Sequence, residues 1–110
     1  MIQDSDNRLR FAGLEPERCQ TIQQVRDGVD EIDALLLDLI VRRQAYTVRA
    51  AKIKRDAGSQ VRDEARLAYQ IERAKQLGAQ KGISPMLIEP IFRTLIEQHV
   101  AFETIQHAKA

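Results

Sequence analysis

The chain has few of the residues that build disulfide frameworks and metal centres. It has one cysteine, Cys19, two histidines and no tryptophan among 110 residues. A single cysteine cannot form an intrachain disulfide, and with two histidines it makes a poor set of metal ligands. We therefore expect no metal, no disulfide and a reducing compartment.

Long apolar runs and an excess of one charge are also missing. The longest wholly apolar run covers residues 34–37, far too short to span a bilayer, and residues 1–6 lack the basic and apolar regions of a signal peptide. Seventeen basic against sixteen acidic residues leave a net charge of +1, so no overall field attracts nucleic acid or an anionic membrane. We expect a cytoplasmic protein that binds neither.

One long helix dominates the first half of the chain. Thr21 and Gln24 have the form of a capping box, and apolar residues then recur every three or four positions until Ala57-Gly58 supplies a stop. A helix of about 34 residues is about 50 Å long, whereas a domain of this size has a radius of gyration of only about 13 Å. Its own chain cannot cover such a helix.

Two shorter helices follow. One is predicted from about Asp63 to about Gly78, and another from Ser84 as N-cap toward Gln106, with Pro90 expected to kink or delay it. No strand pattern is present. We predict an all-α fold with one domain over residues 19–110, preceded by a flexible tail over residues 1–18.

Arg43 interrupts the apolar seam of the long helix. The seam is Ile22, Val25, Val29, Ile32, Leu36, Leu39, Arg43, Tyr46, Ala50 and Ile53, and Tyr46 fits it as a core residue. A guanidinium buried there costs several kcal/mol unless an anion meets it. Alone, Arg43 is explained as readily by snorkelling or by a carboxylate on a neighbouring helix.

The spacing of Arg43 from other cations favours a ligand. Arg43 and Lys54 are separated by about 16 Å along an ideal helix and by about 20° around it, so both side chains could reach one small dianion. Arg26 lies about 42 Å from Lys54 and could reach that ligand only from a second copy of the chain. A symmetric dimer with two shared sites is one arrangement that fits.

Polar residues on the later helices each have a simpler structural explanation. His99 and Glu103 form an i,i+4 pair on the inward stripe of the last helix, usually a structural feature. Asp63 suits an N-cap, while Arg62 and Arg66 suit a solvated face.

Together these residues resemble a known family. Arg26-x3-Asp30-x2-Asp33, Arg42-Arg43, Lys54, Val61-Arg62-Asp63-x2-Arg66, Ile91-Phe92 and Glu103 resemble the all-helical (type II) chorismate mutases and their relative, isochorismate pyruvate lyase. The resemblance covers roughly residues 16–106. It implies an intertwined homodimer of three-helix chains, without cofactor or metal, that converts chorismate to prephenate for aromatic amino acid biosynthesis.

The resemblance also implies site residues. Arg43, Lys54 and Arg66 would line a site to which the partner chain lends its Arg26. Arg26 and Arg43 would hold substrate carboxylates, and Lys54 a carboxylate and the ether oxygen. The remaining positions are Asp63, at a contact to the substrate ring; Glu103, hydrogen-bonded to the ether oxygen; and His99, in place of a small hydroxyl residue.

Departures from the mutase pattern leave the substrate open. Leu67 stands where bacterial mutases carry a glutamate that accepts from the substrate hydroxyl. An aliphatic residue there is a feature of the lyase, which also shares Pro16-Glu17-x-Cys19 and Tyr46, whereas Asp63 looks more like a mutase. Cleavage of isochorismate to salicylate and pyruvate is therefore the alternative activity.

Two alternatives come from other classes of protein. A non-catalytic helical dimer or adaptor would also explain the long seam. A nucleic-acid binder would use the basic residues of the long helix, although the net charge and the lack of interleaved aromatic residues disfavour it. Those residues are Arg42, Arg43, Arg49, Lys52, Lys54 and Arg55.

Overall fold

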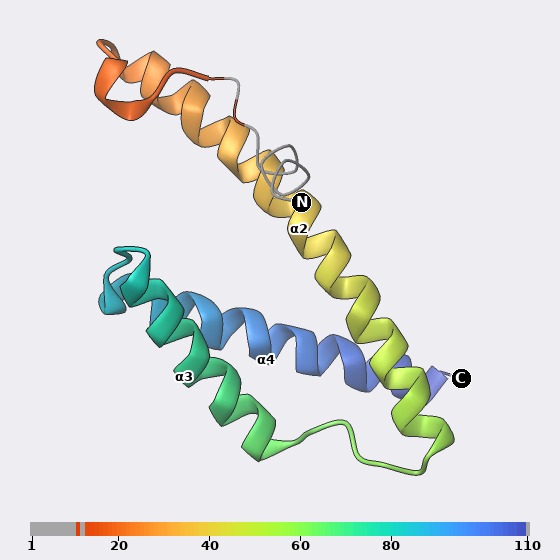
Figure 1. The fold of residues 1–110 in the computed structure, drawn as a ribbon. Helices are drawn as coiled ribbons and strands as arrows, with labels where there is room; N and C mark the ends of the chain where they lie inside the picture. Colours follow the sequence, from red (N-terminus) through yellow and green to blue (C-terminus); the bar gives the residue numbers. More distant parts are fainter. Residues whose placement is uncertain (1–10, 12, 110) are drawn as a thin grey trace, which may run out of the picture. The chain divides into compact units, whose positions relative to one another are not determined.

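The computed structural model describes residues 11 and 13–109, which fold almost entirely as helices. A 3-10 turn, η1, is followed by three α-helices, and the described residues contain no strand (Figure 1). The bounds are Pro16–Arg18 for η1, Ile22–Asp56 for α2, Glu64–Gln80 for α3 and Pro85–Lys109 for α4. The predicted all-α chain of three helices with a long first helix is confirmed.

Most of the tail expected over residues 1–18 cannot be compared with the structure. Residues 1–10 and 12 lie outside the described residues. The rest includes η1, whose Pro16 carbonyl accepts a hydrogen bond from the backbone N–H of Cys19 at 3.1 Å.

The start of α2 is set by the capping box. The hydroxyl of Thr21 accepts from the backbone N–H of Gln24 at 3.1 Å. In return, Oε1 of Gln24 accepts from the backbone N–H groups of Thr21 at 3.2 Å and Gln20 at 2.7 Å. Three N–H groups at the helix start are thereby satisfied by side chains, as the sequence predicted.

The end of α2 is a Schellman motif. Gly58 has a φ of +71°, a left-handed conformation that only glycine adopts at little cost. The turn allows Ser59 N–H to reach the carbonyl of Lys54 at 2.7 Å and Gly58 N–H to reach that of Arg55 at 3.0 Å. The predicted stop is confirmed, and it turns the chain at Gly58, four residues after Lys54.

The later helices also begin at their predicted caps. Oδ1 of Asp63 accepts from Arg66 N–H at 3.0 Å, and Ser84 Oγ accepts from Met86 N–H at 3.2 Å. The expected delay at Pro90 is wrong, because α4 runs from Pro85 through Pro90 without a break. A proline in the second turn of a helix removes only one backbone hydrogen bond.

The chain divides into two compact units, residues 1–43 and 44–110. In the second unit, α3 lies alongside α4 (Figure 1). The buried apolar residues of this unit are Ala51 of α2, Ala74 of α3, and Ile88 and Ile96 of α4. Gly78 permits close packing there, since a Cβ at this position would lie 3.2 Å from Cγ1 of Ile88. This small core fixes α3 and α4 together.

The first unit leaves its apolar seam open. Val29 is 52% exposed and Leu36 is 51% exposed. Near the start of α2, the seam borders a cavity of about 480 Å³ lined by Phe11, Leu14, Glu15, Pro16, Cys19, Val25, Gly28, Val29 and Ile32. In the second unit Tyr46 is 79% exposed, so the prediction that it is a core residue is wrong for a single chain.

Truncating Ile96, which is 3% exposed, should destabilise the second unit. We expect Ile96→Ala to lower the free energy of unfolding by about 2 to 4 kcal/mol, because it removes buried methylene groups and leaves a void. Met86→Ala, at a residue 88% exposed, should change it little. Urea denaturation followed by helical circular dichroism measures both, and equal effects would contradict this account of the core.

Candidate active site

A half-buried ion pair joins the end of α2 to α4. Nζ of Lys54 lies 2.9 Å from Oε2 of Glu103, and the two side chains are 31% and 11% exposed. The ammonium is within ion-pair distance, yet it does not meet Oε2 in hydrogen-bonding geometry. Oε2 of Glu103 is therefore a buried oxygen without a hydrogen bond in the described part of the chain. Such an atom needs a partner, which can be an ordered water, an ion or a ligand.

The Lys54 ammonium is held from a second side by the loop between α2 and α3. Nζ donates to the backbone carbonyl of Val61 at 2.7 Å. A lysine ammonium has three N–H donors. One is used by Val61 and one faces Glu103, so the third can serve a bound anion.

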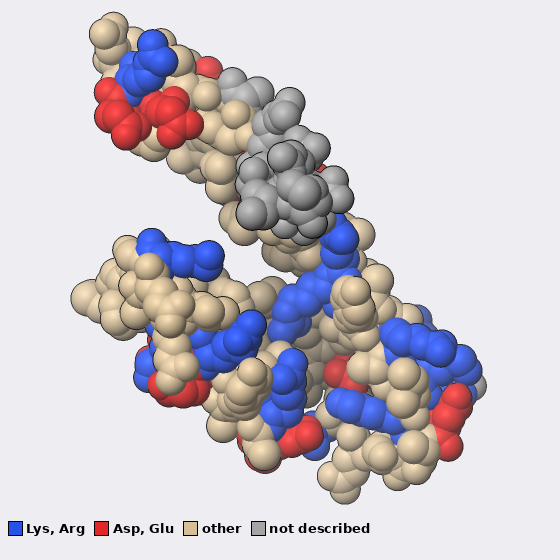
Figure 2. All heavy atoms as spheres, viewed as in Figure 1, with Lys and Arg blue, Asp and Glu red and all other residues tan. Residues whose placement is uncertain are grey.

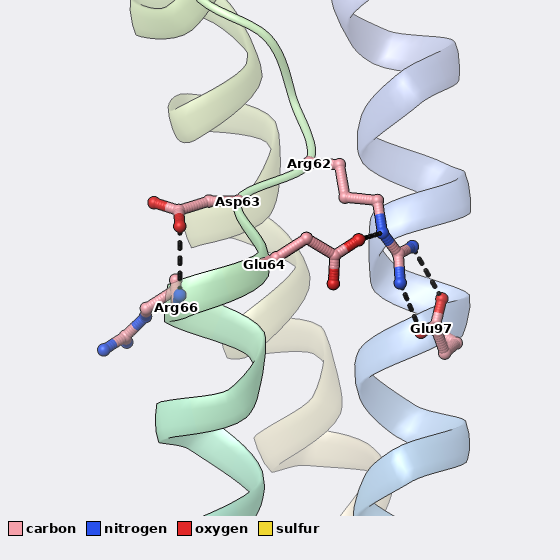
Figure 3. A network of polar contacts seen from close by, with 5 residues as sticks. All are labelled: Arg62, Asp63, Glu64, Arg66 and Glu97. Atoms are coloured by element: carbon pink, nitrogen blue, oxygen red, sulfur yellow. Dashed lines mark hydrogen bonds and ion pairs between the residues drawn. The ribbon is translucent and has the colours of Figure 1, made fainter.

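Arg62, the next residue of the loop, forms hydrogen bonds with both α3 and α4 (Figure 3). Its Nη atoms donate to the two carboxylate oxygens of Glu97 on α4 at 3.0 and 2.9 Å. Its Nε donates to Glu64 at the start of α3 at 2.6 Å. The hydrogen bond to Glu97, and then that to Glu64, raise the pKa of Arg62. Arg62 is exposed, as the sequence predicted, and it also bridges α3 and α4.

Asp63 and Arg66 lie on the other side of the same turn. Asp63 is the N-cap of α3, which confirms its structural role. The Arg66 side chain points away from Arg62 and Glu97 in Figure 3, and its guanidinium lies 5.2 Å from the centroid of the Tyr69 ring. Arg66 is exposed, so its charge is available to a ligand at this surface.

His99 is half-buried on α4 and hydrogen-bonds within its own helix. Its Nδ1 lies 2.9 Å from the carbonyl oxygen of Leu95. A carbonyl only accepts, so Nδ1 carries a proton, and Nε2 of a neutral ring would be an acceptor. The geometry supports the structural explanation of His99 without giving it a ligand.

The two remaining predicted residues, Arg26 and Arg43, lie on the part of α2 that belongs to the first unit. Arg26 is exposed and Arg43 is half-buried. Within the second unit, the structure brings together Lys54 and Glu103 and places Asp63 and Arg66 at the start of α3.

A cavity of about 310 Å³ lies between α3 and α4. Leu67 is one of its apolar lining residues, and the lining also includes charged side chains. The lining residues are Arg62, Glu64, Leu67, Ala68, Ile71, Glu72, Arg93, Ile96 and Glu97. Leu67, which departs from the mutase pattern, is therefore a half-buried wall residue.

Sequence reasoning missed Val61 and Glu97. Val61 acts through its backbone carbonyl, which no side-chain pattern reveals. Glu97 is 35 positions from Arg62, and nothing local distinguishes it from other surface acids. The motif Val61-Arg62-Asp63-x2-Arg66 pointed to this turn but not to these two contacts.

The described residues were also compared with two other types of functional feature, a metal centre and a membrane span. They contain no group of three side chains that could hold a metal ion, and none of their helices is long and apolar enough to cross a membrane. Basic and acidic side chains are interspersed on the face drawn in Figure 2.

Comparison with known proteins identifies the family of this chain. Residues 25–104 match the family described as chorismate mutase type II. The chain belongs to this family. It is therefore an isomerase that acts on chorismate. It is also 29% identical over 84 residues to the chorismate mutase of Methanocaldococcus jannaschii, an alignment that covers 76% of this chain and 85% of that protein. No solved structure gives a significant match.

The pKa of Glu97 should report on the Arg62 bridge of this mutase. The hydrogen bond from Arg62 lowers this pKa below its ordinary value of 4.5. We expect Arg62→Met to raise it toward 4.5, as followed by carboxylate carbon NMR during an acid titration. The pKa of Glu89 is lowered by Arg93 and then Lys75, so it serves as an internal control that should not move.

Proposed function

We propose that Lys54 and Glu103 are the catalytic groups of the chorismate rearrangement. The observation that carries this assignment is the buried Glu103 oxygen, which lacks a hydrogen bond and faces an ammonium held at 2.9 Å. A cation and an adjacent carboxyl group can approach an ether oxygen from two sides. Neither needs to act as a nucleophile.

The reaction explains why such a simple set of groups suffices. Chorismate becomes prephenate as one carbon–oxygen bond breaks and one carbon–carbon bond forms within the same molecule. The enzyme must hold the compact reactive conformer and stabilise charge that grows on the ether oxygen. A millionfold acceleration corresponds to about 8 kcal/mol, and one preorganised donor can supply about 3 to 4 kcal/mol. Two donors would provide most of it.

The other side chains in this proposal bind the substrate. Arg43, together with Arg26 of a partner chain, would hold the two carboxylates, while Arg66 completes the positive wall. Asp63 and His99 are assigned to the edge of the substrate site by resemblance alone. These cations would balance a dianion that Lys54 could not balance by itself.

A second chain is part of the proposal, as an intertwined homodimer. Val29 and Leu36 are about half exposed on the α2 seam, and burying such apolar side chains is the main driving force of association. A partner packed along this seam would bring its Arg26 to the site. We place the enzyme in the cytoplasm, where the lone Cys19 would remain reduced.

Glu103 would donate to the ether oxygen in its protonated form. In the single chain its carboxylate is paired with Lys54. A bound dianion would draw on Lys54 and bring further negative charge close to Glu103, and like charges favour the neutral acid.

Cleavage of isochorismate is the second candidate, and Leu67 is the observation that favours it. This half-buried aliphatic side chain offers no acceptor for the hydroxyl of chorismate. The same cations and Glu103 would bind isochorismate, in which the analogous bond breaks with transfer of a hydrogen. Parallel assays of both substrates distinguish the two, with ultraviolet loss of chorismate in one and salicylate fluorescence in the other.

Removing the charge of Lys54 or of Arg43 should abolish most turnover. We expect Lys54→Ala and Arg43→Ala to lower turnover of chorismate by about 100-fold to 1,000-fold, because each removes a preorganised donor. Circular dichroism should show the fold retained, and Lys52→Ala, on the same helix, should keep normal activity. Near-normal rates in Lys54→Ala or Arg43→Ala would exclude that residue from the site.

The pH profile tests the protonation of Glu103. Wild-type turnover should fall toward alkaline pH, because only a protonated carboxyl group can donate to the ether oxygen. Glu103→Gln carries a permanent amide donor, so its rate should stay level over the same range. A flat wild-type profile from mildly acidic to alkaline pH would contradict the role of Glu103 as a donor.

A further inference from the structure

The loop between α2 and α3 is tied to α4 at two points. Near its start, the Ser59 carbonyl accepts from Nε2 of His107 at 3.1 Å. At its end, Arg62 forms two hydrogen bonds with Glu97. The Lys54–Glu103 pair joins the end of α2 to α4, and Glu103 lies between Glu97 and His107 on that helix. The loop thus rests along one side of α4.

Val61 connects these ties to the catalytic lysine. Its carbonyl accepts from Lys54 Nζ at 2.7 Å, and it directly precedes Arg62 in the chain. Adjacent Cα atoms are only 3.8 Å apart, and the peptide between them is planar. A shift of Arg62 therefore moves the carbonyl of Val61, and with it one of the groups that orient the ammonium.

We propose that the Arg62–Glu97 ion pair is a positioning device that fixes the Lys54 ammonium for the reaction. The inference rests on the role of Lys54 given above. Arg62 and Glu97 need not touch the substrate, since they act through the Val61 carbonyl. A closed ring results, from Glu97 through Arg62, Val61 and Lys54 to Glu103 and back along α4.

Stability alone does not account for this pair. The Arg62 and Glu97 side chains are 45% and 48% exposed, and exposed ion pairs contribute little to the free energy of folding. What two parallel hydrogen bonds provide is a defined orientation. Orientation matters in catalysis, because a misplacement of about 1 Å can cost about 100-fold in rate.

The start of α3 depends less on Arg62 than the loop does. Asp63 caps α3 locally, and the buried residues Ala74 and Ile96 help pack that helix against α4. Arg66 should therefore keep its place when Arg62 is lost. The effect should fall mainly on Lys54.

A double-mutant cycle tests this coupling. We expect Arg62→Met and Glu97→Gln each to lower turnover of chorismate by about 10-fold to 100-fold, with Arg62→Lys intermediate because a lysine cannot bridge both oxygens. In a Lys54→Ala background, Arg62→Met should cause no further loss, since the group it positions is gone. Turnover of these slow variants is measured with enzyme in excess over substrate.

Lys52→Met is the matched control. It breaks another exposed ion pair, Lys52–Asp56 at 3.4 Å, which lies on the helix that carries Lys54 and includes no residue of the loop. Its turnover should stay normal, and its urea midpoint should resemble that of Arg62→Met. A loss specific to Arg62→Met would then be catalytic in origin.

The possible failures are distinguishable. If Arg62→Met keeps wild-type turnover, or if its loss multiplies with that of Lys54→Ala, the positioning role is overturned while the site stands. If Lys54→Ala itself turns over chorismate normally, the proposed catalytic site falls, and the inference falls with it.

Discussion

A charge removed from water must find partners, and this requirement organises the second unit. Glu103 is only 8% exposed, and a carboxylate at that depth is costly unless it is paired. Its partner, Lys54, is the third residue from the end of α2 and leaves its third donor for a ligand. The helix end, the loop and α4 are thus arranged around one ammonium.

Much of this arrangement was readable from sequence because its signals are local. The caps at Thr21, Asp63 and Ser84 and the left-handed Gly58 set helix ends through groups within a few residues. Lys54 and Glu103 were identified by resemblance, and the structure places their Nζ and Oε2 atoms 2.9 Å apart. Pro90 was misjudged because the loss of one hydrogen bond did not interrupt α4.

The remaining contacts are tertiary, and sequence carried little trace of them. The Val61 carbonyl is a backbone group, and the partner of Arg62 lies 35 positions away on another helix. Tyr46 followed the seam, yet a seam predicts only that a face will be covered, and in one chain this side chain is 79% exposed. A pattern indicates which residues share a face without identifying what covers it.

The tethered loop restricts how relatives of this enzyme can diverge. Ser59, Val61 and Arg62 are held at successive points, so an inserted residue between Gly58 and Asp63 would put a different carbonyl opposite the lysine. The turn between α3 and α4 does not contain a group that orients Lys54. Changes of length should therefore accumulate in that turn, while the first connection keeps its residue count even where its side chains change.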